Sequence, residues 1–216
     1  MRTRVVCTTR ADGDFNADLV APEVLSTRRR AVVDLPWTWL DEVHGTDVAI
    51  VDRPGGAAGA TADGAVTAVA GAAISVWVGD CAPVALLSGT VIAVAHAGWR
   101  GLRDGVLAST VEQMRRLGAT AIRAEIGPHI HRCCYEFGLD DLDTLVSRFG
   151  PSARSVTRDG RPALDMTAAV IAALEELGVP TESIGPCTGC DGDRYWSHRA
   201  RGERGRQAMV VWMEEP

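Results

Sequence analysis

The chain contains no lysine, since all 22 of its basic residues are arginine. Without a lysine amine, the protein cannot form a lysine Schiff base or use lysine as a nucleophile. The sequence also lacks an apolar run long enough to cross a bilayer. No apolar stretch of about 7–15 residues follows the N-terminal arginines, as a secretory signal would require. These absences predict a cytoplasmic protein that does not act at a membrane.

A block of positive charge is missing as well. The chain carries 28 acidic residues against 22 arginines, which gives a formal net charge of −6. The single basic cluster, Arg28–Arg30, is expected on a solvated helix face. An acidic chain of this kind is a poor partner for the phosphate backbone, so binding to nucleic acid is not expected.

The composition is that of a globular protein. Hydrophobic residues make up 46% of the 216 positions and charged residues 23%, close to the average for globular domains. We find no repeat, low-complexity tract or linker, and the segment 54–60, rich in glycine and alanine, is expected to be a loop. The sequence therefore predicts one domain over residues 1–216.

The apolar pattern predicts both strands and helices. Runs of β-type residues predict strands at Ala31–Asp34, Val48–Val51, Ala73–Val78, Val84–Leu87, Val91–Ala95, Ala121–Ile126 and Ala208–Trp212. Helical periodicity predicts helices at Leu102–Leu117, Leu139–Phe149 and Met166–Leu177. Asp165 and Gly178 are expected to cap the last of these. Because strands occur in runs as well as between helices, we expect a mixed-sheet α+β fold.

Residues of metal-binding or catalytic types lie at the ends of these strands in four strings. The strings are Asp41–Thr46, Val78–Pro83, Val94–Gly101 and Ile126–Glu136. Taken alone, a histidine beside a glycine or a cysteine at a strand end usually has a structural role. Cys81 and His96, however, flank two successive strands that are joined by a short turn at Ser88–Thr90. A hairpin there would bring the two side chains to the same edge of the sheet.

Five strings in the chain resemble one known family. They are Glu42–Thr46, Asp80–Val84, Ala95–Gly101, Gly127–Glu136 and the segment from Ser197 to Arg206. Together they resemble the laccase-domain family, whose members are also called polyphenol oxidases, peptidoglycan editing factors and purine nucleoside phosphorylases. The resemblance extends from Thr8 to the C-terminal strand. The string Ala-His-Ala-Gly-Trp-Arg-Gly at Ala95–Gly101 is its most specific part.

The resemblance implies a zinc site formed by His44, Cys81 and His96. It also implies phosphorolysis of adenosine, inosine, guanosine and methylthioadenosine, with phosphate as the second substrate, and hydrolytic deamination of adenosine. The implied fold has α/β/β/α layers and is shared with deamidating bacterial toxins, in which a cysteine and a histidine form a catalytic dyad.

The chemistry of these residue types agrees with that implication. Two imidazoles and one thiolate leave a fourth position open on zinc, which is the pattern of catalytic zinc. Zinc lowers the pKa of a bound water to about 7, which suits deamination. Phosphorolysis needs an anion pocket instead. Arg100 lies four residues after His96, where a helix is predicted to open, and is the first candidate to bind phosphate.

Three further residues are candidates for the pocket. Asp80 precedes Cys81 and can accept a hydrogen bond behind a ligand, carry a proton or stabilise the turn. His129 and Tyr135 are expected to contact the substrate. Where the family commonly has Gln-Val-His-Gly, this chain has Glu42 in the first position. The polarity of the pocket is therefore expected to differ.

Six cysteines in a cytoplasmic chain favour metal ligands, a nucleophile or core residues over disulfides. Cys133 and Cys134 are expected to be packed thiols. Cys187 and Cys190 form a Cys-x-x-Cys pair, of which only the first cysteine matches the family pattern. A single pair supplies half of a structural zinc site, and thioredoxin-type redox chemistry would require it at a helix start after the first strand.

Two other classes of function remain open at this point. Cys81 and His96 could act as nucleophile and base in acyl transfer to an amide or a peptidoglycan precursor. Two histidines and one cysteine also describe a blue-copper site, which would make copper the cofactor. Of the five histidines, three lie outside the proposed site, and they hardly provide the second ligand cluster of a multi-copper oxidase.

Overall fold

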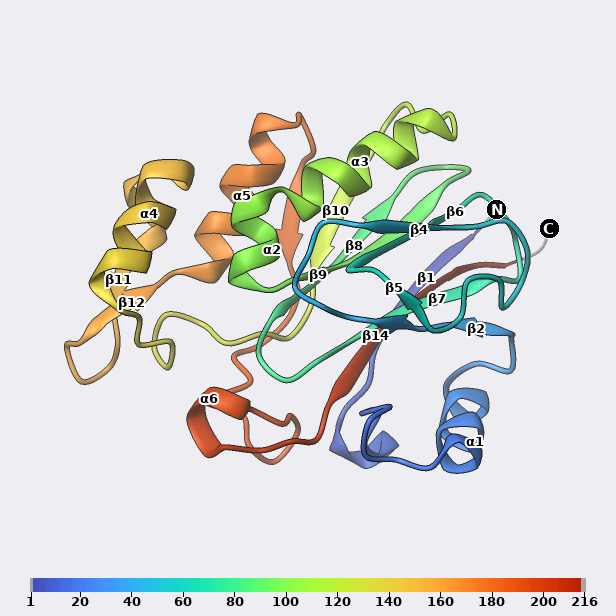
Figure 1. Ribbon diagram of the computed structural model, residues 1–216, viewed down its shortest axis with the longest axis horizontal. Helices are drawn as coiled ribbons and strands as arrows, with labels where there is room; N and C mark the ends of the chain where they lie inside the picture. Colours follow the sequence, from blue (N-terminus) through green and yellow to red (C-terminus); the bar gives the residue numbers. More distant parts are fainter. Residues whose placement is uncertain (1, 215–216) are drawn as a thin grey trace.

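Two stacked β-sheets form the centre of the computed structural model, which describes residues 2–214 (Figure 1). The larger sheet has the order β13 (Thr181–Ser183), β10 (Arg123–Ile126), β8 (Ala82–Leu87), β9 (Ile92–Ala97), β6 (Gly64–Thr67), β4 (Val48–Val51). The smaller has the order β1 (Thr3–Cys7), β14 (Gln207–Met213), β7 (Ala73–Val78), β2 (Trp37–Thr38). Two ribbons pair β3 (Leu40–Asp41) with β5 (Ala60–Thr61), and β11 (Arg154–Val156) with β12 (Pro162–Leu164).

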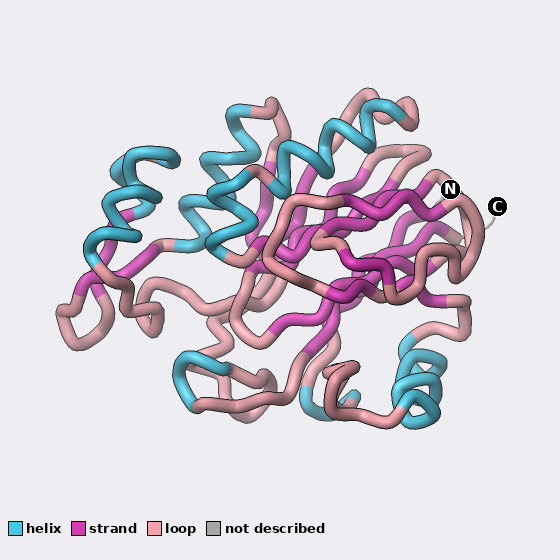
Figure 2. The backbone as a smooth tube through the Cα atoms, viewed as in Figure 1, coloured by secondary structure: helices cyan, strands magenta, loops and turns pink. Residues whose placement is uncertain are grey.

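Helices cover the outer faces of this stack (Figure 2). The six-stranded sheet carries α2 (Trp99–Asp104), α3 (Val106–Arg116) and α5 (Met166–Glu176), and α4 (Leu139–Phe149) packs on α5. Beside the four-stranded sheet lies α1 (Pro22–Val32), and α6 (His198–Arg201) is a single turn near the cavity described below. Short 3₁₀ turns occur at Arg10–Asp12 and Pro151–Ala153. No helix within residues 2–214 is long and apolar enough to span a membrane.

The hairpin β8–β9 is apolar on both faces because both faces are buried. Val84 and Leu86 pack toward the helices, whereas Ala85 and Val94 pack against the four-stranded sheet. Strands buried in this way appear in a sequence as nearly continuous hydrophobic runs rather than as alternating patterns. The hairpin thus lies at the buried centre of the molecule, and its open end faces the candidate site.

A smaller apolar cluster covers the outer face of the four-stranded sheet. Phe15, Trp37 and Trp212 form its buried centre, and Val32 at the end of α1 packs against it. Helices, six-stranded sheet, four-stranded sheet and α1 therefore follow one another as α/β/β/α layers. This confirms the predicted α+β fold with mixed sheets.

Six of the seven predicted strands and two of the three predicted helices are present with small shifts of their ends. The strand predicted at Ala31–Asp34 is wrong, because α1 continues to Val32 and turns its last apolar residues toward the cluster around Trp37. The helix predicted at Leu102–Leu117 is split into α2 and α3 at Gly105, whose φ of 105° interrupts the helix. Asp165 caps α5 as predicted, accepting a hydrogen bond from the amide of Ala168 at 3.0 Å.

Candidate metal centre

The predicted hairpin brings Cys81 next to His96. Strands β8 and β9 pair in antiparallel register, with Pro83 opposite His96 and Ala82 opposite Ala97. Cys81 immediately precedes β8 and His96 lies at the end of β9, so both side chains reach the open end of the hairpin. Cys81 is partly exposed, whereas His96 is buried.

His44 completes this group from the loop between β3 and β4. Its Nε2 lies 3.7 Å from the Sγ of Cys81, and its ring meets the ring of His96 edge to face at 4.7 Å between centroids. The ligand atoms of His44, Cys81 and His96 all lie within 4.8 Å of one another. Gly98 makes room for this arrangement, because a Cβ there would come within 2.5 Å of the His44 ring.

Asp63 holds the group together and was not predicted from the sequence. Its fully buried carboxylate accepts a hydrogen bond from the Nδ1 of His96 at 2.8 Å. It also accepts the backbone amides of His44 at 2.9 Å and Gly45 at 2.6 Å. His44 has a φ of 60°, a left-handed conformation that costs a non-glycine residue about 1–2 kcal/mol. The hydrogen bonds to Asp63 stabilise that conformation.

The ionisable groups at this site shift one another's pKa values. Burial raises the pKa of Cys81, but the neighbouring His96 and His44 outweigh it and lower the pKa to about 6. Burial likewise lowers the pKa of His96, but Glu42, Cys81 and Asp63 outweigh it and raise the pKa well above its ordinary value. Burial also raises the pKa of Glu42 to about 8, against the opposing effect of His96. Cysteine thiolate and imidazole are thus held in mutually stabilising contact.

The side chains of His44, Cys81 and His96 lie close enough together to bind one metal ion. Because the Nδ1 of His96 is bound to Asp63, its Nε2 is the nitrogen left for a metal, and a carboxylate behind a ligand histidine is the usual way of fixing the ring. Two nitrogens and one sulfur form a donor set that zinc accepts, and copper accepts the same set. These Cys and His side chains can therefore hold a metal.

A cavity of about 390 Å³ adjoins the three candidate ligands. Its lining residues are Glu42, His44, Trp77, Val78, Gly79, Asp80, Cys81, His96, Trp99, Arg100, Tyr135, His198, Arg199 and Arg206. Arg100 lies over the ring of Trp99 at 4.3 Å, and Arg199 over that of Tyr135 at 4.9 Å. Stacking restricts both guanidinium groups and keeps them beside the cavity. The wall is therefore partly aromatic and carries three arginines.

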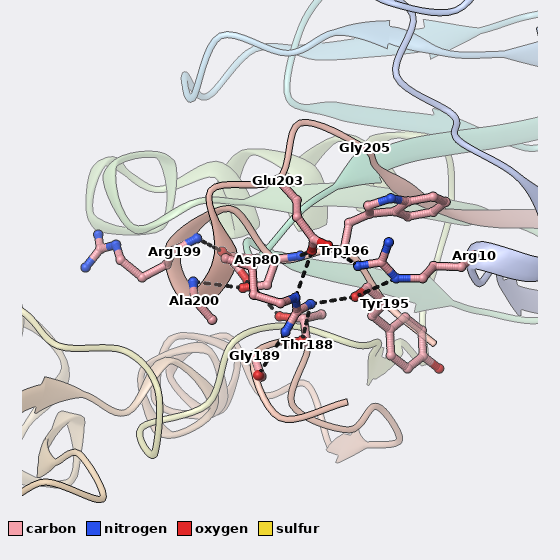
Figure 3. A network of polar contacts seen from close by, with 12 residues as sticks. Arg10, Asp80, Thr188, Gly189, Tyr195, Trp196, Arg199, Ala200, Glu203 and Gly205 are labelled. Atoms are coloured by element: carbon pink, nitrogen blue, oxygen red, sulfur yellow. Dashed lines mark hydrogen bonds and ion pairs between the residues drawn. The ribbon is translucent and has the colours of Figure 1, made fainter. Parts of the chain in front are cut away.

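Asp80 fastens the C-terminal segment to this cavity (Figure 3). One carboxylate oxygen accepts hydrogen bonds from the hydroxyls of Thr188 and Ser197, both at 2.7 Å. The other accepts the backbone amide of Arg199 at 2.7 Å. These contacts tie Asp80 to the distant segment that carries Arg199, rather than to a candidate ligand or to its own turn.

The structure brings most of the sequence candidates together at the cavity, but not all. Arg100 and Tyr135 line it. His129 does not: its buried ring contacts the carbonyl of Gly127 and the hydroxyl of Thr167, each at 2.8 Å. Both ring nitrogens thus have partners within the chain, and the buried His129 side chain is not among the residues that line the cavity, where it was expected.

Sequence reasoning missed Arg199 and Arg206 as cavity residues. Arg206 approaches from the segment before β14, and a Cβ on Gly79 would come within 2.9 Å of its guanidinium. Both arginines lie in the C-terminal string that carries the family resemblance, so their place in that string was the one signal that could have identified them.

Comparison with known proteins identifies the family. The family model described as multi-copper polyphenol oxidoreductase laccase matches residues 13–214, so the chain belongs to this family. A purine nucleoside phosphorylase of Streptomyces coelicolor is 37% identical over 210 residues, covering 94% of this chain and 86% of the relative. A purine nucleoside phosphorylase of Xylella fastidiosa is 40% identical over 186 residues, covering 81% of this chain and 71% of the relative.

Solved structures show the same fold. A Neisseria meningitidis protein matches with a TM-score of 0.86 and 28% identity, covering 99% of this chain and 95% of that one. The YlmD protein of Geobacillus stearothermophilus matches with a TM-score of 0.84 and 28% identity, covering 99% of this chain and 92% of that one. The layered arrangement is therefore common to the family.

Proposed function

We propose that the protein is a zinc-dependent purine nucleoside phosphorylase that also deaminates adenosine hydrolytically. The observation that carries the proposal is the convergence of His44, Cys81 and His96 on one cavity that also holds Arg100 and Arg206. Relatives that carry the name purine nucleoside phosphorylase support the first activity. A three-ligand group with room for a fourth supports the second.

The arginines provide the anion site that phosphorolysis requires. Arg100, Arg199 and Arg206 all line the cavity, and guanidinium groups bind phosphate oxygens in paired hydrogen bonds. Because stacking holds Arg100 and Arg199 in place, and Asp80 also binds the Arg199 backbone, little ordering of these two residues remains when phosphate binds. The cavity volume of about 390 Å³ lies in the range of about 300–1,000 Å³ common for small-molecule sites.

In phosphorolysis, a phosphate oxygen forms a bond to C1′ of the ribose while the bond from C1′ to the purine nitrogen breaks, and the purine leaves with a proton. Arg100 and its two neighbours orient the phosphate and balance its charge. Trp77 supplies an aromatic surface for the base. Adenosine, inosine, guanosine and methylthioadenosine share the bond that is broken, so we propose all four as substrates.

Zinc held at these ligands supplies a Lewis acid next to the substrate. Other side chains of the protein orient the ligands and shield the reacting atoms. Asp63 orients His96 and fixes the loop of His44, so that both imidazoles face Cys81. The aromatic wall, with Trp99 and Tyr135, limits the access of water to the reacting atoms.

The proposal is tested by product analysis with each of the four nucleosides, in the presence and absence of phosphate. We expect free base together with ribose 1-phosphate, or 5-methylthioribose 1-phosphate in the case of methylthioadenosine, only when phosphate is present. We expect inosine from adenosine without phosphate. Cys81→Ser, which loses a metal ligand, should abolish both reactions. If zinc-loaded protein turns over none of the four nucleosides under either condition, the proposal is wrong.

The structure bears on the rival chemistries too. Acyl transfer by a Cys81–His96 dyad would require no third ligand, yet His44 lies against Cys81. Within residues 2–214, the groups of cysteine, histidine and carboxylate side chains that can hold a metal are this one and a cluster of four cysteines. The four-cysteine cluster contains no histidine, so it adds none to the site of His44, Cys81 and His96. A cluster of several coppers would therefore have too few ligands there.

A further inference from the structure

Four of the six cysteines gather about the segments 131–134 and 187–190, away from the cavity ligands. The Sγ of Cys133 lies 3.6 Å from that of Cys187 and 3.3 Å from that of Cys190. The Sγ of Cys134 lies 3.4 Å from that of Cys190. All four sulfur atoms lie within 4.8 Å of one another. The two pairs are more than 50 residues apart in the sequence, so the fold itself assembles the cluster.

The spacing of the sulfurs suits a tetrahedral metal. A zinc–sulfur bond of about 2.3 Å places four sulfurs about 3.8 Å apart at the corners of a tetrahedron. Three of the separations, at 3.3–3.6 Å, come near that value. A disulfide needs about 2.05 Å between two sulfurs. Cys133 and Cys190 each contact two other sulfurs, so the four cysteines do not fall into two separate pairs.

The backbone around the cluster is shaped for close approach of the two segments. Gly189 lies against Cys134, and a Cβ on it would come within 2.7 Å of the Cys134 Cβ. The amides of Cys190 and Asp191 both donate to the carbonyl of Cys187 at 3.1 Å, which folds the Cys-Thr-Gly-Cys loop into a tight turn. That turn directs both of its sulfurs toward Cys133 and Cys134.

Hydrogen-bond donors surround the sulfurs as they would surround thiolate ligands. The backbone amide of His131 donates to the Sγ of Cys187 at 3.3 Å, and the guanidinium of Arg158 donates to the Sγ of Cys190 at 3.2 Å. Four thiolates on a divalent cation carry a net negative charge, which Arg158 offsets. Cys187 is buried, whereas Cys190 is exposed and leaves a path for a metal to enter.

We propose that Cys133, Cys134, Cys187 and Cys190 form a second metal site, a structural site for zinc that is separate from the site at His44, Cys81 and His96. Four protein ligands with no open position are the pattern of structural zinc. The proposal does not depend on the activity proposed above, because it concerns the assembly of the C-terminal half.

The cluster is connected to the cavity on both sides. Cys134 is followed by Tyr135, which lines the cavity. Thr188, inside the Cys-Thr-Gly-Cys turn, donates to Asp80 at 2.7 Å (Figure 3). Arg201 further binds the carbonyls of Thr188 and Gly189. A metal at the cluster would thus fix the segments that position Tyr135 and Asp80 without touching the substrate.

The site is tested by metal analysis of full-length protein purified with reductant. We expect about two zinc ions per chain in the wild type and about one in Cys81→Ser, in which only the four-cysteine site remains complete. Cys81→Ser loaded with cobalt(II) should show strong sulfur-to-cobalt charge-transfer absorbance, and Cys81→Ser combined with Cys134→Ser should lose it. Cys7→Ser, which removes a thiol outside both groups, should keep about two zinc ions.

Retention of metal by Cys81→Ser is the decisive result, because it does not require a variant of the cluster to fold. The proposal is overturned if Cys81→Ser binds neither zinc nor cobalt(II). It is also overturned if peptide mass spectrometry, after free thiols are blocked in the unfolded protein, shows that these cysteines are paired as disulfides. Loss of nucleoside turnover in Cys81→Ser alongside retained zinc would support both sites at once.

Discussion

Replacing Asp63 with asparagine should weaken metal binding without changing any metal ligand. One oxygen of the carboxylate accepts hydrogen bonds from the Nδ1 of His96 and the amide of His44. The other oxygen accepts a hydrogen bond from the amide of Gly45. Asparagine has only one acceptor oxygen and one amino group. If the oxygen stays with His96, the amino group faces the Gly45 amide, so that two donors meet.

The reverse orientation of the introduced asparagine side chain is worse for the metal. The amino group would then donate to the Nδ1 of His96, which would have to become an acceptor. The proton of the neutral imidazole would move to Nε2, the nitrogen that is needed by a metal. Asp63→Asn therefore penalises either the loop of His44 or the ligating form of His96.

The size of the effect follows from these contacts. Each buried donor left without an acceptor costs about 1–3 kcal/mol. In either orientation of the asparagine, one or two of these hydrogen bonds are lost. We expect a loss of about 2–4 kcal/mol in the free energy of unfolding. Changes to residues that support a ligand histidine typically lower metal affinity by about 10–100-fold, and we expect the zinc affinity of the metal centre to fall within that range.

The assay is a competition titration of zinc against a chromophoric chelator, paired with urea unfolding. Asp52→Asn is the matched control, because Asp52 is 73% exposed and pairs with the neighbouring Arg53. The control should behave like the wild type in both measurements. Unchanged zinc affinity and an unchanged unfolding midpoint in Asp63→Asn would show that the carboxylate does not support the ligands.

Three further outcomes are expected. Arg100→Ala should slow phosphorolysis, raising its activation free energy by about 2–4 kcal/mol, and should leave deamination unchanged. Arg53→Ala should change neither reaction. Equal loss of both activities in Arg100→Ala would assign Arg100 another role. Alkylation of Cys81, followed by peptide mass spectrometry, should be slow until a chelator removes the metal, and rapid labelling without chelator would favour covalent catalysis. Gly105→Ala should cost about 1–2 kcal/mol of stability in urea unfolding because its φ is 105°, and Gly89→Ala, with open space around it, should cost less.

The hairpin was predictable because its signal is local. Two apolar runs separated by Ser88–Thr90 predict β8 and β9, and antiparallel pairing then places Cys81 beside His96. The same holds for α4 and for α5 with its Asp165 cap, where periodicity and capping lie within one segment. His44 belongs to a string that the residue types alone single out, but its place beside Cys81 and His96 came only from the family resemblance, since its loop has no strand pairing to anchor it.

The four-cysteine cluster was not predictable, and the reason is topological. Cys187 and Cys190 supply half of a zinc site in sequence, and the other half, Cys133 and Cys134, is adjacent rather than spaced as a Cys-x-x-Cys pair. The two halves meet because β10 and β13 run parallel, which brings the segments after both strands to the same edge. An isolated bridge between His129 and Cys187 continues that pairing.

The same topological reasoning explains where the metal centre lies. Strands β6 and β8 both run antiparallel to β9 and flank it. The beginnings of β6 and β8 therefore lie beside the end of β9. Asp63 immediately precedes β6, Cys81 immediately precedes β8, and His96 is near the end of β9, so one sheet edge gathers the supporting carboxylate and two ligands.

That edge also explains why Asp63 was missed while Cys81 and His96 were found. Strand β6 is only the four residues Gly64–Thr67, and its β-type residues were too few to predict a strand. Without β6 next to β9 there is no reason to place Asp63 near His96, although its carbonyl accepts the His96 amide at 2.7 Å as the pairing continues. The position of a carboxylate behind a ligand thus depends on the order of strands in the sheet, which short-range patterns in the chain do not contain.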